Sequence, residues 1–496
     1  MTVTPSLRGS VFIAVALFAV LVPFYVLDVA RTFHIDFVAF WCAGQATLAH
    51  QNPYLEGSIH ACETSHGLIE SLTVPVPYPP YAMALFALLA LVPEPFAYAL
   101  WCAMTLAAAW LVAWALCRLT GLPLVLTGAT ALLLVIADSL PLGQAAPIAA
   151  CGFTLAVYFV REDRPVAAAI ALAFAAIAPV FAAAAWIAAF VRVPRARVPL
   201  AAAAFVLAGI ALLTTGPQTA SQYFGAVLPA HGRSELNAFW QLGSVAVLHA
   251  AGVAEPAIAP IAYALLGIAI AAGIATGIAL SRRYGGDHWV LACATAFAVA
   301  GAPFAHGADV AFALPVALML FAQRPATLAA VALVFVATPW QHLVQDGGIQ
   351  AAFVIAPLLV VSDAVVGSQM VLAVAIACTI SAGTLAAYKL ADAGKTQLVA
   401  AASLTRVPPP ESIAEARWQA FADASVNPSA AWLSRVPTCV ASLVLVAAAV
   451  QSARRKPIAK SPRLARRGGT SAPYRAKNPR DLCRATVTWR ADRWLR

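Results

Sequence analysis

The stretch PFAYALWCAMTLAAAWLVAWALC, residues 95–117, contains no charged side chain. A helix crosses the hydrocarbon core of a bilayer with about 20 consecutive apolar residues, so this stretch predicts a membrane span. Similar runs recur along most of the chain and predict an all-α, polytopic transmembrane bundle with roughly 11–13 spans. The other expected spans are 11–30, 122–138, 143–160, 165–191, 198–215, 257–281, 288–304, 308–323, 325–343, 350–366, 369–388 and 433–450.

The composition also indicates a membrane protein. Of the 496 residues, 62% are hydrophobic and 10% are charged, whereas an average soluble protein has about 25% charged residues. The sequence contains neither the phosphate-binding pattern G-x-x-x-x-G-K-[ST] nor the nucleophile pattern G-x-S-x-G. These absences argue against a P-loop nucleotide-binding protein and against an α/β-hydrolase.

Three apolar runs need separate interpretation. Run 81–93 is too short to span and ends in VPEP, so we expect a half-helix or a re-entrant piece. Run 165–191 carries Pro179 at its middle and is expected to kink or double back. Run 11–30 has no A-x-A-like cleavage site after it, which favours a retained signal anchor.

Polarity and charge divide the chain. Residues 1–388 form the expected transmembrane domain, with 31–80 as its first outer loop. Residues 389–432 form a polar insert with an amphipathic helical pattern from Glu411 to Ala424, and 433–450 form the last span. Residues 451–496 hold 14 Lys or Arg and two Asp. This tail is expected to be disordered and cytoplasmic, and to contact membrane lipids rather than nucleic acid.

Short arginine-rich loops predict the orientation, because such loops favour the cytoplasmic side. They lie at Arg118, 161–164, 192–197 and 282–283. Most other polar residues then fall together on the opposite face, in segments 31–80, 142–144, 216–244 and 303–309.

Asp36 lies just after the first apolar run, in RTFHIDFVAFWCAGQATLAHQNPYLEG, residues 31–57. Its spacing leaves two interpretations open. It caps a helix that begins at Phe37, or it acts at the membrane surface as a general base that accepts a hydroxyl proton. His34 and Asp36 alone are a poor ligand set for a hard cation, so no metal is expected.

Other residues of the first outer loop carry weaker expectations. Cys42 and Cys62 both fall on the outer side, where a disulfide is conceivable. The acids of this loop are expected to be solvated charges rather than a second catalytic acid; they are Glu56, Glu63 and Glu70.

Three motifs in order carry a family resemblance. They are DFVAFWCAGQATLAHQNPYLEG from Asp36, YPPYAMALFALLALVPEPFAYALW from Tyr78, and LPLGQAAPIAACGFTLA with Gly143 and Gln144. Their order resembles glycosyltransferase family 87, the polyprenol-phosphate-mannose-dependent α-mannosyltransferases of the GT-C superfold. Weaker similarity at 237–252 and 301–320 extends the resemblance over roughly residues 10–325.

The resemblance implies an inverting hexosyltransferase of the bacterial plasma membrane, with Asp36 as catalytic base and no cofactor. The donor would be a polyprenyl-phosphate sugar, with mannose the usual sugar. The acceptor would be a glycolipid or glycan on the non-cytoplasmic face. One departure concerns the donor phosphate, because Ala178 precedes Pro179 where the family often has a lysine. His231, Arg233 and His306 are the candidates to supply the missing positive charge.

Several further residues are candidate substrate ligands with structural alternatives. Gln144 would bond a sugar or phosphate oxygen, or satisfy a helix end. His306 and Asp309, three residues apart, would orient substrate, bind a metal or form an interfacial hydrogen bond. The aromatic side chains of Trp41, Tyr54 and Tyr78 would stack on sugars or anchor the loop among lipid headgroups.

Two alternative functions remain open. A transporter or flippase of lipid-linked sugars is expected to show repeated halves and ionisable residues at the membrane midplane, and neither is visible. An inactive relative that acts as a scaffold would retain the fold and lose the chemistry.

Overall fold

The computed structural model describes residues 34–323 (without 69, 71, 135–138, 237 and 239), 328–329, 332–333, 336, 409–425 and 428–454. The expected spans 11–30, 350–366 and 369–388, most of 325–343, residues 389–408 and the tail beyond 454 lie outside the described residues. Within the described part every regular element is a helix, and Leu55 forms one isolated bridge with Ile413. The all-α fold class is confirmed.

Four described helical segments are long and apolar enough to cross a membrane. They are α5 (Glu94–Thr120), α11 (Arg197–Gln222) extended through α12 (Leu228–His231), α14 (Glu255–Tyr284) and α22 (Pro428–Arg454). α11 exposes its apolar side chains almost completely, with Phe205 78% and Leu213 91% exposed. Such continuous apolar surface suits contact with lipid tails, so the protein is a polytopic membrane protein.

Shorter helices complete the bundle. They are α6 (Leu124–Leu134), α7 (Leu140–Leu142), α8 (Ala146–Arg161), α9 (Pro165–Ala175), α10 (Pro179–Arg192), α13 (Ser244–Ala250), α15 (His288–Gly301) and α16 (Leu314–Gln323). The predicted break at Pro179 is confirmed, because proline lacks the N–H that would continue α9. Run 81–93 is also confirmed as short, with only η1 (Pro80–Ala82) and α4 (Met83–Leu89) in it.

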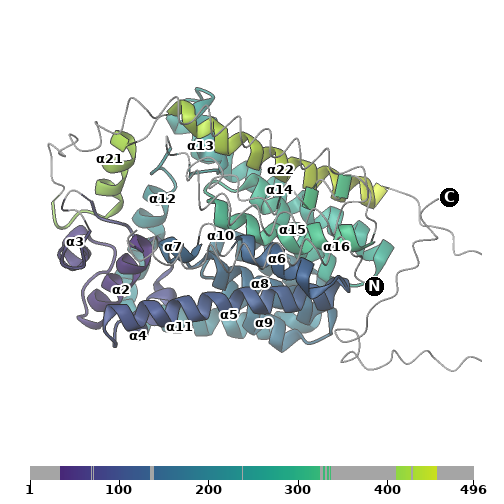
Figure 1. The fold of residues 1–496 in the computed structure, drawn as a ribbon, viewed down its shortest axis with the longest axis horizontal. Coiled ribbons are helices and arrows are strands. Elements are labelled where there is room, and N and C mark those ends of the chain that lie inside the picture. Colours follow the sequence, from purple (N-terminus) through teal and green to yellow (C-terminus); the bar gives the residue numbers. More distant parts are fainter. Residues whose placement is uncertain are drawn as a thin grey trace, which may run out of the picture.

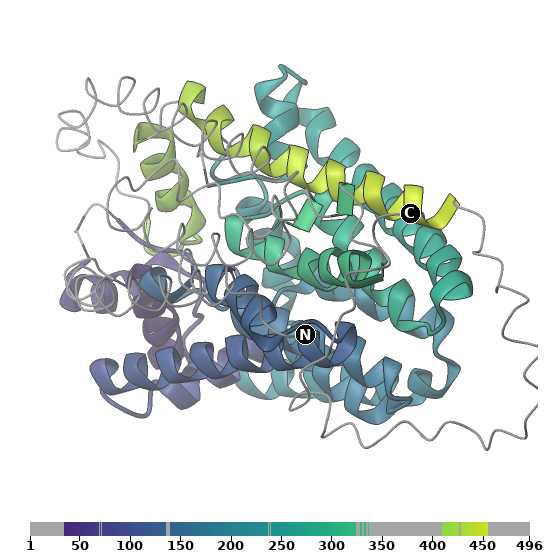
Figure 2. The same ribbon diagram turned by 45° about the vertical axis from the view of Figure 1, so that its right-hand side comes forward.

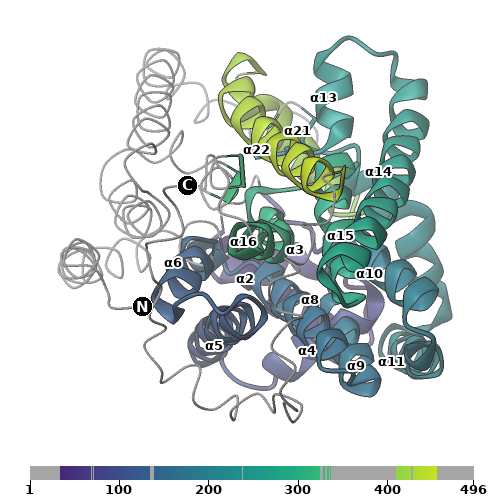
Figure 3. The same ribbon diagram turned by 90° about the vertical axis from the view of Figure 1, so that its right-hand side faces the viewer.

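Helix α15 is the core of the bundle, with almost all of its residues buried. Gly277 of α14 packs against it so closely that a Cβ would lie 2.6 Å from the Cα of Val290. Small residues allow this close approach of helices in membranes. α22 packs against both α14 and α15, as Figures 2 and 3 show.

One end of the bundle carries the arginines. Arg161 donates to the carbonyls of Arg118 and Leu119 at the end of α5. Arg192 pairs with Asp287 at 3.0 Å. The predicted separation of these arginines from the other polar residues is present. α8 runs from Ala146 at the polar end to Arg161 at this end, and its 16 residues span about 24 Å at 1.5 Å per residue.

The opposite end is formed by the first loop and a cap, visible together in Figure 1 as α2, α3 and α21. α2 spans Ile35–Leu48, α3 spans Glu56–Ser65 and α21 spans Glu415–Ser425. A disulfide joins Cys42 of α2 to Cys62 of α3. A helix was expected from Glu411 to Ala424, and α21 lies there but begins at Glu415.

The cap segment 409–425 pairs with the first loop. The Glu56 N–H donates to the Ser412 carbonyl at 2.8 Å, and the Ala414 N–H donates to the Tyr54 carbonyl at 3.0 Å. Arg417 forms an ion pair with Glu56 at 2.6 Å, and both side chains are buried. The two chain segments are thus held together by backbone and side-chain contacts.

The expectation that the acids of the first loop are solvated is wrong for two of them. Glu56 is buried in its ion pair with Arg417. Glu63 is fully buried and accepts the Val74 N–H at 3.1 Å. Only Glu70 is exposed. The cap covers this part of the loop, and nothing in the local sequence signals that cover.

Candidate active site

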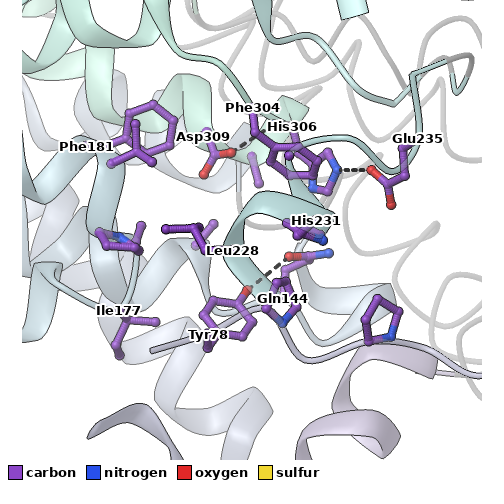
Figure 4. A pocket seen from close by; sticks show the side chains of 18 of the residues that line it. Tyr78, Gln144, Ile177, Phe181, Leu228, His231, Glu235, Phe304, His306 and Asp309 are labelled. Carbon is purple, nitrogen blue, oxygen red and sulfur yellow. Dashed lines mark hydrogen bonds and ion pairs between the residues drawn. The ribbon is translucent and has the colours of Figure 1, made fainter. Parts of the chain in front are cut away.

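A pocket opens at the capped end of the bundle. It brings together six of the residues predicted from sequence, namely Asp36, Tyr78, Gln144, His231, His306 and Asp309. Figure 4 shows most of them around the cavity, with apolar side chains of α10 and α12 between the polar ones. Residues far apart in the sequence therefore converge on one site.

Asp36 lies in the first turn of α2, which begins at Ile35. It is not the helix cap that one interpretation proposed for a helix starting at Phe37. A carboxylate in a first turn is stabilised by the positive end of the helix dipole. The Gln144 side-chain amide donates to Asp36 Oδ2, and the Tyr78 hydroxyl lies 3.5 Å from Gln144 Oε1. These contacts favour the charged carboxylate.

The turn that presents Gln144 requires glycine at position 143. Gly143 has φ +80°, and a Cβ there would lie 2.4 Å from the Phe37 Cβ. The Trp101 indole donates to the Gly143 carbonyl at 2.9 Å. The turn is thereby pressed against the start of α2, next to Asp36.

A glutamate–histidine pair lines another part of the pocket. His306 Nε2 lies 2.9 Å from Glu235 Oε2, and Figure 4 shows the two side chains facing each other. Asp309 accepts the His306 backbone N–H at 2.8 Å, in a capping box at the start of η5 (Gly307–Ala313). The predicted proximity of His306 and Asp309 is thus an interfacial hydrogen bond that fixes the backbone of His306.

Glu235 is held in place by the C-terminal part of the chain. It has φ +61°, which is uncommon for a residue with a side chain. The Trp418 indole of α21 donates to Glu235 Oε1. Arg435 of α22 donates to three carbonyls of the following loop, those of Leu236, Ala238 and Gln241 at 2.7–2.8 Å.

The surroundings of Glu235 favour its charged form. Burial alone would raise the pKa of Glu235. The electrostatic effect of His306 and His231, together with hydrogen bonds from His306 and Trp418, more than offsets this, so the pKa lies below its usual value. The His306 side chain also accepts the Asp309 backbone N–H in the capping box, so its imidazole is bonded on both sides. Tyr78 shows the opposite effect, because burial and the nearby carboxylates of Asp36 and Asp309 raise its pKa.

Three predicted ligands lie outside the pocket lining. The Trp41 indole donates to the Val92 carbonyl at 3.0 Å, and the Tyr54 hydroxyl donates to the Tyr78 carbonyl at 2.8 Å. The first bond therefore ties α2 to the segment after α4, and the second joins two parts of the first loop. Arg233 is exposed next to the pocket residue Gly232.

The contacts of His34 that bear on the metal interpretation are with α5. His34 pairs with Glu94 and stacks on Tyr98 with ring centroids 3.8 Å apart. Among the described residues one cluster has metal-ligand side chains within reach of one another, namely Cys42, Cys62 and His66. Its two cysteines form the disulfide and so offer no thiolate.

The fold and the site define a polytopic membrane protein with paired acids, an amide and imidazoles in a pocket at one end of its helices. The family model of glycosyltransferase family 87 matches residues 77–305. This part of the membrane protein is therefore similar to a family of glycosyltransferases. Neither the curated proteins nor the solved structures contain a match to the chain. Asp36, His306 and Trp418 lie outside the matched stretch.

Sequence reasoning missed Glu235 and Trp418. Glu235 is the single acid in the polar stretch HGRSELN, between His231 and the motif at 237–252, and an isolated acid beside a histidine was the available signal. Trp418 lies 183 residues from Glu235, and no local pattern links the two.

Proposed function

We propose that the protein transfers a hexose, mannose being the sugar the family resemblance favours, from a polyprenyl-phosphate donor to a lipid or glycan acceptor on the non-cytoplasmic face. Asp36 is the general base. The observation that carries the proposal is the position of Asp36 in the pocket, bonded to Gln144 and sharing the cavity with His306 and His231.

The chemistry is a single displacement. The acceptor hydroxyl oxygen attacks the anomeric carbon of the donor, and Asp36 takes the hydroxyl proton. The bond from that carbon to the phosphate oxygen breaks, polyprenyl phosphate leaves with the bonding electrons, and the configuration inverts. The leaving phosphate needs stabilisation rather than protonation. His231, Arg233 and His306 remain the candidates to stabilise this charge in place of the lysine absent before Pro179.

A lipid-borne donor fits the surface around the pocket. The lining includes Tyr263 of α14, which is 52% exposed. Ile177, Val180 and Leu228 contribute apolar walls. A polyprenyl chain reaching the pocket sideways would remain in contact with apolar surface throughout, which minimises its exposure to water.

Two observations support a non-cytoplasmic site. The short-loop arginines Arg118, Arg161 and Arg192 lie at the other end of the bundle, and short loops rich in arginine favour the cytoplasm. The disulfide between Cys42 and Cys62 lies at the end that carries the pocket, and disulfides persist in oxidising compartments.

Reconstitution tests the proposal. Purified protein in lipid vesicles receives radiolabelled polyprenyl-phosphate mannose and a panel of glycolipid acceptors. We expect labelled glycolipid from the wild type and a loss of about 10²–10⁴-fold in Asp36→Asn. The matched control is Asp163→Asn, which removes an exposed carboxylate at the arginine end and should retain activity.

The other outcomes separate the alternatives. Full activity of Asp36→Asn would exclude Asp36 as the base. Movement of the labelled donor across the vesicle membrane without product would indicate a flippase. Neither transfer nor movement, with any of the donors or acceptors, would indicate an inactive scaffold.

A further inference from the structure

A second cavity lies at the arginine end of the bundle. It is bordered by the ends of α5, α8, α14 and α16 and by the start of α15. Its volume is about 260 Å³, whereas one water molecule needs about 10–15 Å³. Ala146 at the start of α8 lines the pocket that contains Asp36, and Arg161 at the end of α8 lines this cavity. The two sites are therefore separated by the length of that helix.

Arg161 brings a positive charge to the cavity. Its Nη1 donates to the carbonyls of Arg118 and Leu119, which holds the guanidinium in place. Among the described residues no carboxylate pairs with it, and Asp163 in the turn that follows pairs with Arg195 instead. A guanidinium has five N–H donors, so the remaining donors of Arg161 are available to an anion.

His288 brings a buried side chain without a partner. It is 8% exposed and lines the cavity. Neither ring nitrogen has a hydrogen-bond partner within the described part of the chain; Nδ1 is buried against Gly286, which leaves Nε2 as the nitrogen that reaches the cavity. Polar atoms of largely buried side chains usually have a partner. An acceptor in the cavity would supply one.

The start of α15 (His288–Gly301) adds backbone donors. The first N–H groups of a helix have no acceptor within it, and this end of a helix favours an anion. Gly286, with φ +87°, and His288 both line the cavity, and neither backbone N–H has an acceptor among the described residues. The Asp287 carboxylate between them pairs with Arg192 at 3.0 Å, and Asp287 is not part of the lining.

The cavity lies where membrane-crossing helices end. α5 ends at Thr120 and α14 ends at Tyr284, and both of these residues line the cavity. Both helices are long and apolar enough to cross a membrane. The ends of such helices reach the level of the lipid headgroups, and basic pockets between spans on the cytoplasmic side suit anionic headgroups.

We propose that this cavity binds an anionic phosphate group, through Arg161, His288 and the first N–H groups of α15. The position at headgroup level favours an anionic phospholipid as the source of the phosphate, and soluble phosphate has the same chemistry. The proposal goes beyond the transfer reaction and does not depend on it, because the residues that line this cavity and those that line the pocket with Asp36 are different.

Binding to the full chain in neutral detergent tests the proposal. The probes are dioleoylphosphatidylglycerol, the zwitterionic dioleoylphosphatidylcholine with the same tails, and inorganic phosphate. Native mass spectrometry measures the bound lipids, and calorimetry measures the bound phosphate. We expect the glycerol lipid to bind about tenfold more tightly than the choline lipid, the worth of one hydrogen bond to a charged group.

Two variants locate the site. Arg161→Gln and His288→Phe should each weaken binding of the glycerol lipid about tenfold. His288→Phe keeps a ring next to Trp289 and removes both nitrogens, so it tests the site without removing the bonds that Arg161 makes to α5. The matched control is Arg164→Gln, which removes an exposed arginine of the same turn outside the lining and should leave the affinity unchanged. Melting temperatures check that each variant folds.

The remaining outcomes decide the source of the phosphate or overturn the proposal. Inorganic phosphate that binds without the glycerol lipid, and that both variants weaken, would assign the cavity to soluble phosphate. Unchanged affinity in His288→Phe, or an equal loss in Arg164→Gln, would overturn the site. Equal binding of the two lipids without binding of inorganic phosphate would show attraction of the tails alone, and absence of binding by all three probes would also overturn the proposal.

Discussion

The Gln144 side-chain amide donates to the Asp36 carboxylate across 108 residues of sequence. An amide donor stabilises a carboxylate in its charged form without adding a competing charge. The acid thus remains available as a base, while its orientation is fixed by a residue from a different part of the bundle. Changes at Gln144 should accordingly alter the charge state of Asp36 rather than the fold.

Gln144→Glu should shift the pH dependence of transfer. A second carboxylate next to Asp36 disfavours ionisation, so the pKa of the pair's base rises. A base with a raised pKa stays protonated to higher pH, and activity is therefore lost earlier as the pH falls. We expect the acid limb of kcat/KM to move upward by about one pH unit or more. Gln323→Glu, at an exposed site of the arginine end, is the control and should leave the profile in place.

Gly143→Ala should abolish transfer and destabilise the protein. The added Cβ would lie 2.4 Å from the Phe37 Cβ. Position 143 also has a left-handed backbone, which residues with a Cβ rarely adopt. Gly121→Ala is a matched control, because Gly121 has φ +71° with no atom within 4 Å of a built Cβ. The free energy of unfolding of the control should fall by only about 1 kcal/mol, the cost of the strained backbone. Equal melting temperatures of the two variants would show that Phe37 tolerates the extra carbon.

Reduction of the Cys42–Cys62 disulfide should lower the melting temperature. The bond closes a loop with a sequence separation of 20, and loops of similar length correspond to about 3 kcal/mol. The double variant Cys42→Ser, Cys62→Ser should unfold at the same lower temperature with and without reductant. Cys439→Ser removes a free thiol and should respond to reductant like the wild type. A wild-type curve that reductant leaves unchanged would contradict the bond.

The cap should be less stable at alkaline pH because of Glu415. This side chain is 2% exposed, and burial raises its pKa to about 8, with a smaller lowering by its own backbone N–H. The stabilisation by the protonated form is therefore fully present below the ordinary glutamate pKa of 4.5 and is lost as the pH rises through about 8. Glu415→Gln should melt like the wild type at acid pH and at a higher temperature at pH 9. Glu411→Gln, at an exposed site nearby, should match the wild type at both pH values.

The membrane helices and their breaks were predictable from the sequence because they depend on local composition. Uncharged runs predicted α5, α11 and α14, and the lack of an N–H at Pro179 predicted the end of α9. Asp36 and Gln144 were both chosen as site residues through the order of motifs. Their direct contact was not predicted, since spacing along the chain does not determine which helix ends meet.

The parts that sequence reasoning missed depend on tertiary contacts with the C-terminal segment. Glu56 and Glu63 look like solvated loop acids until Arg417 and the cap are placed over them. Glu235 becomes conspicuous only when His306 and Trp418 are both beside it. A buried ion pair between distant segments leaves no periodic pattern in either one.

The contribution of Trp418 to the pocket has a consequence for biosynthesis. A ribosome delivers Asp36 to the membrane early and Trp418 only after α5, α11 and α14 have been made. The nascent chain therefore carries an incomplete pocket through most of its insertion, and the site closes when the cap docks on the first loop. Assembly of the enzyme is complete at that late step, after the membrane has already accepted the helices that the site depends on.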